Sequence, residues 1–212
     1  MAEGLRERKK RQTRQYISDV ATGLFLERGF EAVTVAEIAE AANVSVNTVY
    51  NYFPAKEDLF LDRSAGVVDR LARWVRGRDA GESAARAVLR ELREEVEAVS
   101  PRVGLMEGYS RFMRVIHDAP PLRSRLWSLR QESHDNLRAA LCEETGAPED
   151  DPLPDLMAGQ ICWIYDTVFA SIGREMLKGR GPVEVSREML QLLDEVEGLL
   201  SERVLEYAVR GA

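Results

Sequence analysis

Six of the eight residues at 45–52 of this 212-residue chain have uncharged side chains that can form hydrogen bonds. The run holds one serine, one threonine, two asparagines and two tyrosines, and it contains no charged residue. Hydroxyl, amide and phenol groups suit base edges and phosphate oxygens, whereas a helix that only faces water usually carries Lys, Glu and Arg. Two interpretations remain: a surface that contacts nucleic acid, or a polar surface helix that happens to lack charge.

The segment around this run has the start and stop signals of two short helices. Thr34, with a glutamate three residues later, predicts a capping box at the start of the first helix. Asn43 stands where the chain must turn, since asparagine tolerates the left-handed conformation. Ser45 predicts the N-cap of the second helix, in which Val49 and Phe53 would face a core. This arrangement is typical of a helix-turn-helix and favours the nucleic-acid interpretation.

Residues 10–60 resemble the DNA-binding domain of the tetracycline-repressor (TetR) family of bacterial regulators. The matching residues are Ala21, Phe25, Gly29, Phe30, Thr34, Val35, Ile38, Ala39, Ala42, Val44, Ser45, Tyr50, Phe53, Lys56, Glu57 and Leu59. The resemblance covers roughly the first quarter of the chain and implies that the second helix enters the major groove. Carried over by position, it implies DNA contacts by Thr34, Ser45, Val46, Asn47, Thr48, Tyr50, Asn51, Tyr52 and Lys56.

Two positions depart from the family pattern. Asn43 stands where glycine is usual, which the turn should tolerate. Ala55 stands where a capping serine is usual, which should cost ~1 kcal/mol of helix stability.

The positive charge of the chain is concentrated at its N-terminus, and the rest of the chain is acidic. The whole chain carries −7. Residues 1–14 hold six basic side chains and two acidic ones, a net charge of +4, so the remainder carries −11. A basic segment on an acidic body is typical of a protein that meets DNA with one end only, although a solvated disordered tail would carry the same charges. Arg14, in this segment, is a further candidate DNA contact.

The composition predicts an all-α fold, because good helix formers dominate and no strand-like alternation longer than about four residues occurs. We expect a basic disordered arm at 1–9, an N-terminal helix-turn-helix DNA-binding domain at 10–54, a connecting helix at 55–77, and a C-terminal helical ligand-binding and dimerisation domain at 82–212. About nine helices are expected in total. Those that follow the helix-turn-helix are expected near 55–76, 83–99, 103–117, 122–144, 155–177 and 185–209, after a first helix at 10–28.

Two of these helices, 155–177 and 185–209, are apolar over more than one face. A helix that is apolar on several sides is buried on several sides, either inside a monomer or against a second copy. Two-fold dimers are common among proteins that read palindromic DNA, and the TetR resemblance implies the same. We therefore expect a homodimer that forms through these two helices.

The second domain is where we expect a small-molecule site. Aromatic walls with a few polar groups are typical of such sites, although an ordinary core edged by salt bridges has the same composition. The resemblance implies an effector without identifying it. The candidate ligand-binding residues are Trp74, Met106, Tyr109, Phe112, Met113, Trp127, Arg130, His134, Trp163, Asp166 and Phe169.

Signals for catalysis, metal binding and membrane insertion are missing from the sequence. His117 and His134 belong to no metal motif, and no phosphate loop or nucleophile elbow is present, so we expect no catalytic residues, no metal and no cofactor. Cys142 and Cys162 lack metal spacing and are expected to be reduced. The most apolar stretch, 161–172, is too short to span a bilayer and no signal peptide is seen, which predicts a cytoplasmic protein without a membrane partner.

These features predict a DNA-binding transcriptional regulator whose partners are a palindromic operator, a small-molecule effector and a second copy of the chain. The main hypothesis is a repressor that the effector releases from its operator. The alternatives of the same fold are an activator and an unliganded constitutive repressor. The alternative from another class is a helical small-molecule-binding protein, a carrier or an enzyme, that has kept the N-terminal domain only for stability and lacks inducer-controlled repression. The uncharged helix face and the basic segment disfavour a carrier, because neither feature would help it.

Overall fold

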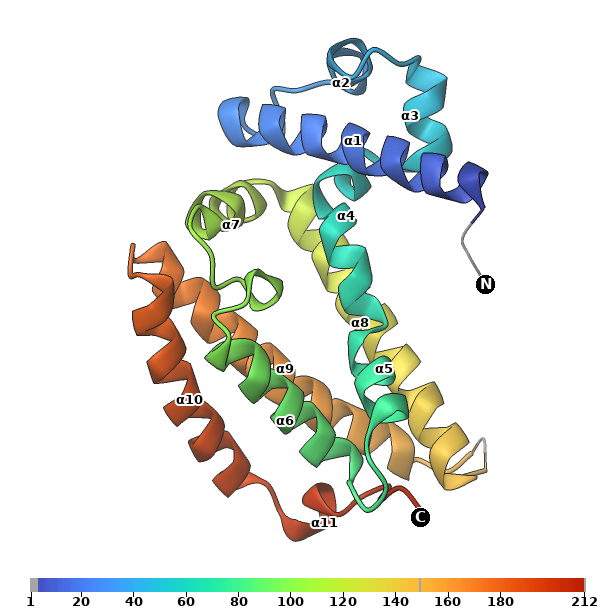
Figure 1. Cartoon of the computed structure of the whole chain (residues 1–212), viewed down its shortest axis with the longest axis vertical. Helices are drawn as coiled ribbons and strands as arrows, with labels where there is room; N and C mark the ends of the chain where they lie inside the picture. Colours follow the sequence, from blue (N-terminus) through green and yellow to red (C-terminus); the bar gives the residue numbers. More distant parts are fainter. Residues whose placement is uncertain (1–3, 149, 212) are drawn as a thin grey trace. The chain divides into compact units, whose positions relative to one another are not determined.

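The computed structural model describes residues 4–148 and 150–211, without the side chains of residues 63–65. Every regular element in these residues is a helix, so the prediction of an all-α fold is confirmed (Figure 1). The elements are α1 (Leu5–Arg28), α2 (Val35–Ala41), α3 (Val46–Tyr52), α4 (Lys56–Val68), α5 (Arg70–Gly77), α6 (Ala84–Glu97), the short 3-10 helix η1 (Pro101–Val103), α7 (Tyr109–Asp118), α8 (Pro120–Thr145), α9 (Leu153–Leu177), α10 (Pro182–Leu199) and α11 (Glu202–Leu205).

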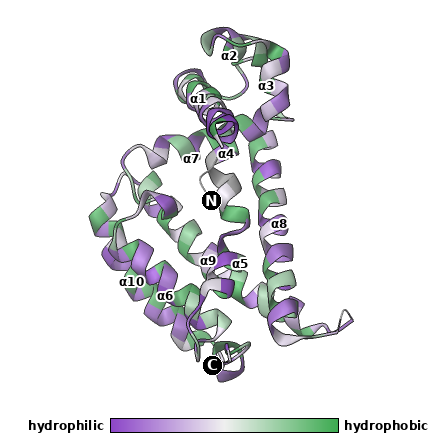
Figure 2. Ribbon diagram, turned by 45° about the vertical axis from the view of Figure 1, so that its right-hand side comes forward, coloured by the Kyte–Doolittle hydropathy of each residue, from purple (hydrophilic) through white to green (hydrophobic). Residues whose placement is uncertain are grey.

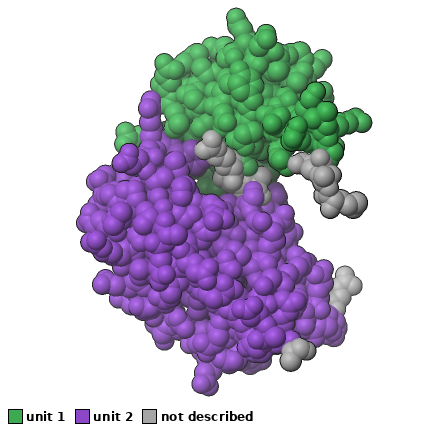
Figure 3. Space-filling view, in the orientation of Figure 1, with its two compact units in different colours: residues 1–65, 114–127 green, residues 66–113, 128–212 purple. Residues whose placement is uncertain are grey.

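The chain divides into two compact units (Figure 3). Unit 1 comprises residues 1–65 and 114–127, and unit 2 comprises residues 66–113 and 128–212. The helices α4, α7 and α8 each have residues in both units. The two units are therefore joined by continuous helices rather than by an extended linker.

The core of unit 1 forms around the inner face of α1. Ile17, Ala21 and Phe25 recur at helical spacing on this face and are fully buried. The ring of Phe25 lies 5.0 Å from that of Phe30 and 5.7 Å from that of Phe60 at an edge-to-face angle. This aromatic contact joins α1 to the turn before α2 and to α4, and such pairs contribute about 0.5–1.5 kcal/mol beyond their buried area.

The first helix begins five residues earlier than predicted, at Leu5. The prediction of a disordered arm over 1–9 is therefore wrong for residues 5–9, which form the first turns of α1, while residues 1–3 lie outside the described residues. The basic residues in this stretch are themselves good helix formers, so their charge does not prevent a helix. The predicted end at Gly29 is confirmed, with a φ of 84° that favours glycine.

Three later helices differ from the predicted ones. The connecting helix is divided at Asp69 into α4 and α5. The helix expected from residue 103 begins only at Tyr109, because Gly104 and Gly108 have φ values of 88° and 82°, which no helix accommodates. The last helix expected over 185–209 ends at Leu199 and is followed by the short α11.

Unit 2 is built on α6, α9 and α10, which pack side by side (Figure 1). The helix α9 is buried over several of its faces, as its apolar pattern predicted, with Ile161, Ile164, Val168 and Ile172 among its fully or almost fully buried residues. In contrast, α6 and α10 carry both hydrophobic and hydrophilic residues along their length (Figure 2). Within the described part of the chain, no helix is long and apolar enough to cross a membrane.

The C-terminal segment after α11 pairs with the loop between α5 and α6. The backbone N–H of Ala84 donates to the carbonyl of Tyr207 at 3.2 Å, and that of Gly81 donates to the carbonyl of Arg210 at 2.9 Å. The N–H of Arg210 donates in turn to the carbonyl of Glu82 at 3.0 Å. These bonds fix the end of the chain onto the body of unit 2.

Candidate nucleic-acid interface and aromatic cluster

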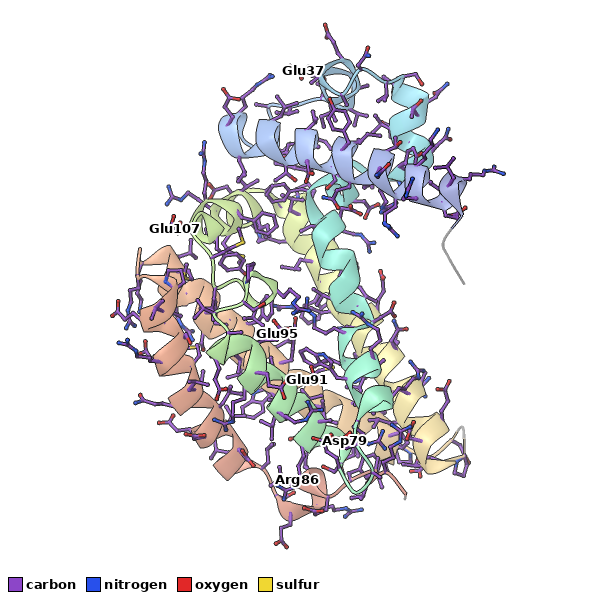
Figure 4. The ribbon with its side chains drawn as sticks, in the orientation of Figure 1. Glu37, Asp79, Arg86, Glu91, Glu95 and Glu107 are labelled. Atoms are coloured by element: carbon purple, nitrogen blue, oxygen red, sulfur yellow. The ribbon has the colours of Figure 1, made fainter. Side chains whose placement is uncertain are left out.

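The start of α2 is a complete capping box. The Thr34 hydroxyl accepts a hydrogen bond from the backbone N–H of Glu37 at 3.2 Å, and Glu37 accepts one from the backbone N–H of Thr34 at 2.7 Å. Arg28 also donates to the Glu37 carboxylate at 2.7 Å. Figure 4 labels Glu37 on this helix. The predicted cap is confirmed, and both the hydroxyl and the backbone N–H of Thr34 take part in it.

The turn between α2 and α3 has the two hydrogen bonds of a Schellman motif. The N–H of Asn43 donates to the carbonyl of Glu40 at 3.0 Å, and the N–H of Val44 donates to the carbonyl of Ala39 at 2.9 Å. Asn43 has a φ of 53°, the left-handed conformation predicted for it. The asparagine therefore performs the role that glycine usually has at this position.

The start of α3 is capped by Ser45, as predicted. Its hydroxyl accepts from the N–H of Thr48 at 3.0 Å and lies 2.8 Å from the Thr48 hydroxyl. Val49 and Phe53 are buried in the core of unit 1. The orientation of α3 is thus fixed by its cap at one end and by two apolar anchors on its inner face.

The outer face of α3 presents the residues predicted to contact DNA. Val46 is 39% exposed and Tyr50 is 50% exposed, and Asn47 and Asn51 are also exposed. Thr48 and Tyr52 are partly covered. The outer face of α3 is therefore open and carries no charge.

Two basic candidates beside α3, Arg14 and Lys56, make contacts inside unit 1. Arg14 donates from Nε to Asp62 at 2.8 Å and from Nη1 to the carbonyl of Tyr52 at 2.5 Å. Lys56 donates from Nζ to the carbonyl of Phe30 at 2.6 Å, and Nζ lies 4.3 Å from the centroid of that ring. Their roles as DNA contacts stay predictions, and both residues also stabilise the fold around α3.

The start of α4 has a substitute for the missing capping serine. Asp58, three residues after Ala55, accepts a hydrogen bond from the Ala55 backbone N–H at 3.2 Å. Its other oxygen, Oδ1, lies 2.8 Å from Nε of Arg125 on α8, within the same unit. Half of a capping box is therefore present, which offsets part of the cost expected from Ala55.

Unit 2 contains an aromatic cluster, which we define as Arg70, Trp74, Tyr165 and Phe169. The ring of Tyr165 lies 4.9 Å from that of Phe169 in a stacked arrangement and 6.2 Å from that of Trp74. Arg70 donates to the Tyr165 hydroxyl at 3.0 Å, and its guanidinium lies 5.9 Å from the Trp74 ring. Burial raises the pKa of Tyr165, so its hydroxyl stays protonated and can accept from Arg70 while donating to another group.

Arg130 of α8 and Asp166 of α9 form a second polar pair in unit 2, with Nε and Oδ1 3.5 Å apart. Burial raises the pKa of Asp166, and Arg130 opposes that shift. Burial also raises the pKa of Tyr109 to about 12, again opposed by Arg130. The rings of Tyr109 and Phe112 stack with their centroids 6.2 Å apart. Tyr109, Arg130 and Asp166 therefore share one electrostatic environment.

The structure gathers only part of the predicted ligand set. Trp127 lies in unit 1, whereas the other candidate ligand-binding residues lie in unit 2. Trp127 is also 62% exposed. Met106 and Trp163 are exposed, and Nε2 of His134 lies 3.9 Å from Oδ1 of Asp155. Met113 approaches α9 at Gly173. A Cβ added to Gly173 would lie 3.8 Å from Cε of Met113.

The sequence analysis missed Arg70 and Tyr165. Each has a partner four residues later in the chain, Trp74 and Phe169 respectively. That i, i+4 spacing places both members of a pair on one face of a helix. It was the signal that could have identified these two residues.

The comparison with known proteins agrees with this geometry. Residues 17–62 match the family model described as bacterial regulatory proteins, tetR family, and that stretch includes the caps, the turn and α3. The chain is therefore similar to TetR-family regulators, as its sequence predicted. Like its TetR relatives, it is a DNA-binding transcriptional regulator.

Two relatives illustrate how the similarity to TetR proteins is distributed. The HTH-type transcriptional regulator TcmR of Streptomyces glaucescens is 29% identical over 180 residues, which span 81% of this chain and 76% of TcmR. The HTH-type transcriptional repressor KstR2 of Rhodococcus jostii is 38% identical over 58 residues, which span 27% of this chain and 28% of KstR2. The shorter match therefore has the higher identity.

Two solved structures share the fold. Native NalD of Pseudomonas aeruginosa aligns with a TM-score of 0.56 at 20% identity, over 88% of this chain and 97% of NalD. The SmeT–triclosan complex aligns with a TM-score of 0.56 at 16% identity, over 91% of this chain and 94% of SmeT. These two structures therefore share the helical fold of this chain over most of its length.

Proposed function

We propose that this protein is a homodimeric repressor of the TetR family that leaves a near-palindromic operator when a small molecule binds to unit 2. The observation that carries the proposal is the outer face of α3, which is capped, anchored and open while carrying no charge. Such a face suits a DNA groove better than water. The names of the relatives KstR and KstR2, both described as repressors, support repression as the direction of control.

The proposed dimer forms through α9 and α10. These helices leave several large apolar side chains uncovered in the single chain, which are Leu156, Trp163, Leu177, Val183 and Leu199. Leu199 is 76% exposed, more than any other large apolar residue in the described part of the chain. Two recognition helices related by a two-fold axis would then read two half-sites about one helical turn apart.

The proposed effector is an apolar or aromatic molecule that binds at the aromatic cluster and the neighbouring Arg130–Asp166 pair. Rings on α5 and α9 supply apolar contact area, and the Tyr165 hydroxyl and Arg70 supply polar contacts. A few polar groups among aromatic walls are typical of small-molecule sites. Tyr109, Phe112 and Asp166 remain candidate contacts.

The experiment that tests DNA binding is a gel shift and footprint on the DNA upstream of the protein's own gene. Tyr50→Ala should weaken binding to all sequences alike, because a phosphate contact carries no sequence information. Tyr50 is half exposed, so this variant should keep the melting temperature of the parent. Lys56→Ala is a poorer choice, since it also removes the bond to Phe30.

A footprint that shows an inverted repeat, with weaker but similarly placed protection by Tyr50→Ala, is the expected result. Binding without any inverted repeat, or unchanged binding by Tyr50→Ala, would contradict the proposed role of α3.

A further inference from the structure

The helix-turn-helix contains no cation that could read guanine. Between Arg28 and Lys56 the chain has no lysine or arginine at all, although it holds 29 such residues elsewhere. Guanine is read in the major groove chiefly by arginine or lysine bonding to its O6 and N7 atoms. Neither α2 nor α3 can make this contact with its own side chains.

The cations that flank this segment are engaged within unit 1. Arg28 donates to Glu37 at 2.7 Å, and Lys56 donates to the carbonyl of Phe30 at 2.6 Å. Arg14 bonds to Asp62 and to the carbonyl of Tyr52, and its guanidinium lies 4.4 Å from the centroid of the Phe53 ring. Reading a guanine with any of these three would require breaking contacts that hold the fold around α3.

The groups that α3 does present are amides and an apolar side chain. Asn47 and Asn51 lie four residues apart and therefore share one stripe of the helix. Both asparagines are exposed, and neither side-chain amide has a hydrogen-bond partner among the residues that the structure describes. The Ser45 and Thr48 hydroxyls, in contrast, are bonded to each other. Val46 is exposed at the first turn.

From this set we propose that α3 reads A·T base pairs. Asn47 and Asn51 bond to the N6 and N7 atoms of adenine, and Val46 contacts the C5-methyl group of thymine. Asparagine matches adenine because its amide offers one acceptor and one donor in the same plane, facing the N6 donor and the N7 acceptor. The proposal rests on the proposed DNA-binding function and adds the bases that each half-site must contain.

The first experiment is selection of binding sites from a random duplex library with the full-length protein. We expect an inverted repeat whose half-sites have A·T pairs at the positions where Asn47→Ala and Asn51→Ala relax the preference. Each good bidentate pair discriminates by about 1–3 kcal/mol, so an A·T to G·C change there should weaken wild-type binding about 5- to 150-fold. The same change should have little effect on the matching alanine variant.

The control variant is Tyr50→Ala, on the neighbouring stripe of α3. It should weaken binding to every selected sequence by a similar factor and leave the order of base preferences unchanged. This separates loss of a base contact from general loss of affinity.

The second experiment replaces single atoms of the selected operator. Uracil in place of thymine removes the methyl group, and should weaken the wild type but not Val46→Ala. 7-Deazaadenine removes N7, and should weaken the wild type but not the asparagine variant that reads that position.

Two results would overturn the proposal in different ways. An inverted repeat with G·C pairs at the positions affected by Asn47→Ala and Asn51→Ala would reject A·T reading while leaving the DNA-binding function intact. Failure to enrich any sequence, together with no gel shift, would reject the proposed function and the base assignment together.

Discussion

The pKa of the Glu37 carboxyl is well below its usual range, although the residue lies at the surface. The backbone N–H of Thr34 contributes most to this shift, followed by Arg28 and by the Thr34 hydroxyl, and together they bring the pKa from 4.5 to about 2. Because the folded pKa lies below the unfolded one, the ionised cap stabilises the fold above about pH 4.5. That contribution is lost as the pH falls from 4.5 towards 2.

The first prediction uses this pH dependence. Glu37→Ala should lower the free energy of unfolding at pH 7, because it removes the capping box and the Arg28 contact. The difference from wild type should shrink between pH 4.5 and pH 2, where the wild-type carboxylate becomes protonated. Urea unfolding at pH 7 and at pH 3 measures both quantities.

The matched control for Glu37→Ala is Glu40→Ala, on the exposed side of the same helix. It makes the same change in helix propensity without removing a cap. A difference between Glu37→Ala and wild type that stays constant with pH, or an equal effect of Glu40→Ala, would show that the cap contributes nothing.

At the scale of elements, the sequence predicted best where the signals were local. Thr34, Asn43 and Ser45 each act on backbone groups within a few residues, so α2, the turn and α3 follow from their types and spacing. The same holds for the apolar face of α1. Helix capping depends on residues that are close together in the sequence and little on tertiary packing.

The elements that differed from prediction depend on contacts between distant parts of the chain. Periodicity continues from residue 105 into α7, but Gly104 keeps a left-handed backbone against which the Tyr109 ring packs, and a Cβ there would lie 2.6 Å from that ring. The pairing of Arg70 with Tyr165 joins residues that are 95 positions apart. The i, i+4 spacing marks the helix face on which each residue lies, but no local pattern shows that the two faces meet. This contact of the proposed effector site could therefore not be predicted.

Arg78 is 2% exposed and connects four segments of unit 2, which are α5, the loop after it, α8 and the C-terminal segment. It donates to the carbonyls of Val75, of Glu82 at 3.1 Å and of Ala208 at 2.8 Å, and it pairs with Glu144 at 2.9 Å. The guanidinium thus satisfies carbonyls of α5, the following loop and the C-terminal segment. Removing one member of a buried pair leaves the others without partners.

The second prediction compares this pair with a neighbouring one at the surface. Arg78→Met should lower the free energy of unfolding by about 3–5 kcal/mol, as expected for breaking a buried ion pair. Arg76→Met removes the Arg76–Glu143 pair, whose side chains are 45% and 65% exposed, and should cost about 0–1 kcal/mol. Chemical denaturation of both variants measures the contrast, and similar losses would show that burial does not decide the contribution.

At the scale of the whole molecule, the third prediction concerns assembly. Leu199→Glu should convert the proposed dimer to a monomer, because a carboxylate desolvated in an apolar interface without a partner costs several kcal/mol. Leu199 is exposed in the single chain, so the monomer itself should keep its fold. Light scattering at micromolar concentration measures the mass, and circular dichroism checks the fold.

The control for Leu199→Glu is Leu5→Glu, which changes an exposed leucine of α1 in unit 1. This variant should remain dimeric. A wild-type protein that is monomeric at micromolar concentration, or a Leu199→Glu protein that stays dimeric, would remove α10 from the proposed interface.

The fourth prediction concerns the coupling between effector and operator. The helix α8 carries Arg130 of the proposed effector site in unit 2, and within unit 1 it carries Arg125, which holds Asp58 in the first turn of α4. Asp58 caps that turn directly after α3. Because a helix is stiff along its length, a ligand that displaces α8 should also move Arg125. This movement should disturb the start of α4 and the adjacent helix α3.

A coupling of about 1–3 kcal/mol would lower DNA affinity about 5- to 150-fold, and linkage requires that operator DNA weaken ligand binding by the same factor. Ligand affinity can be measured by Trp74 fluorescence, with and without operator, in a protein carrying Trp127→Phe and Trp163→Phe. Arg125→Ala should keep ligand affinity in the absence of DNA while reducing the coupling factor, since it releases Asp58 from α8. Equal ligand affinities with and without operator would show that the ligand is not the inducer, and unchanged coupling in Arg125→Ala would show that the signal does not pass through the Arg125–Asp58 contact.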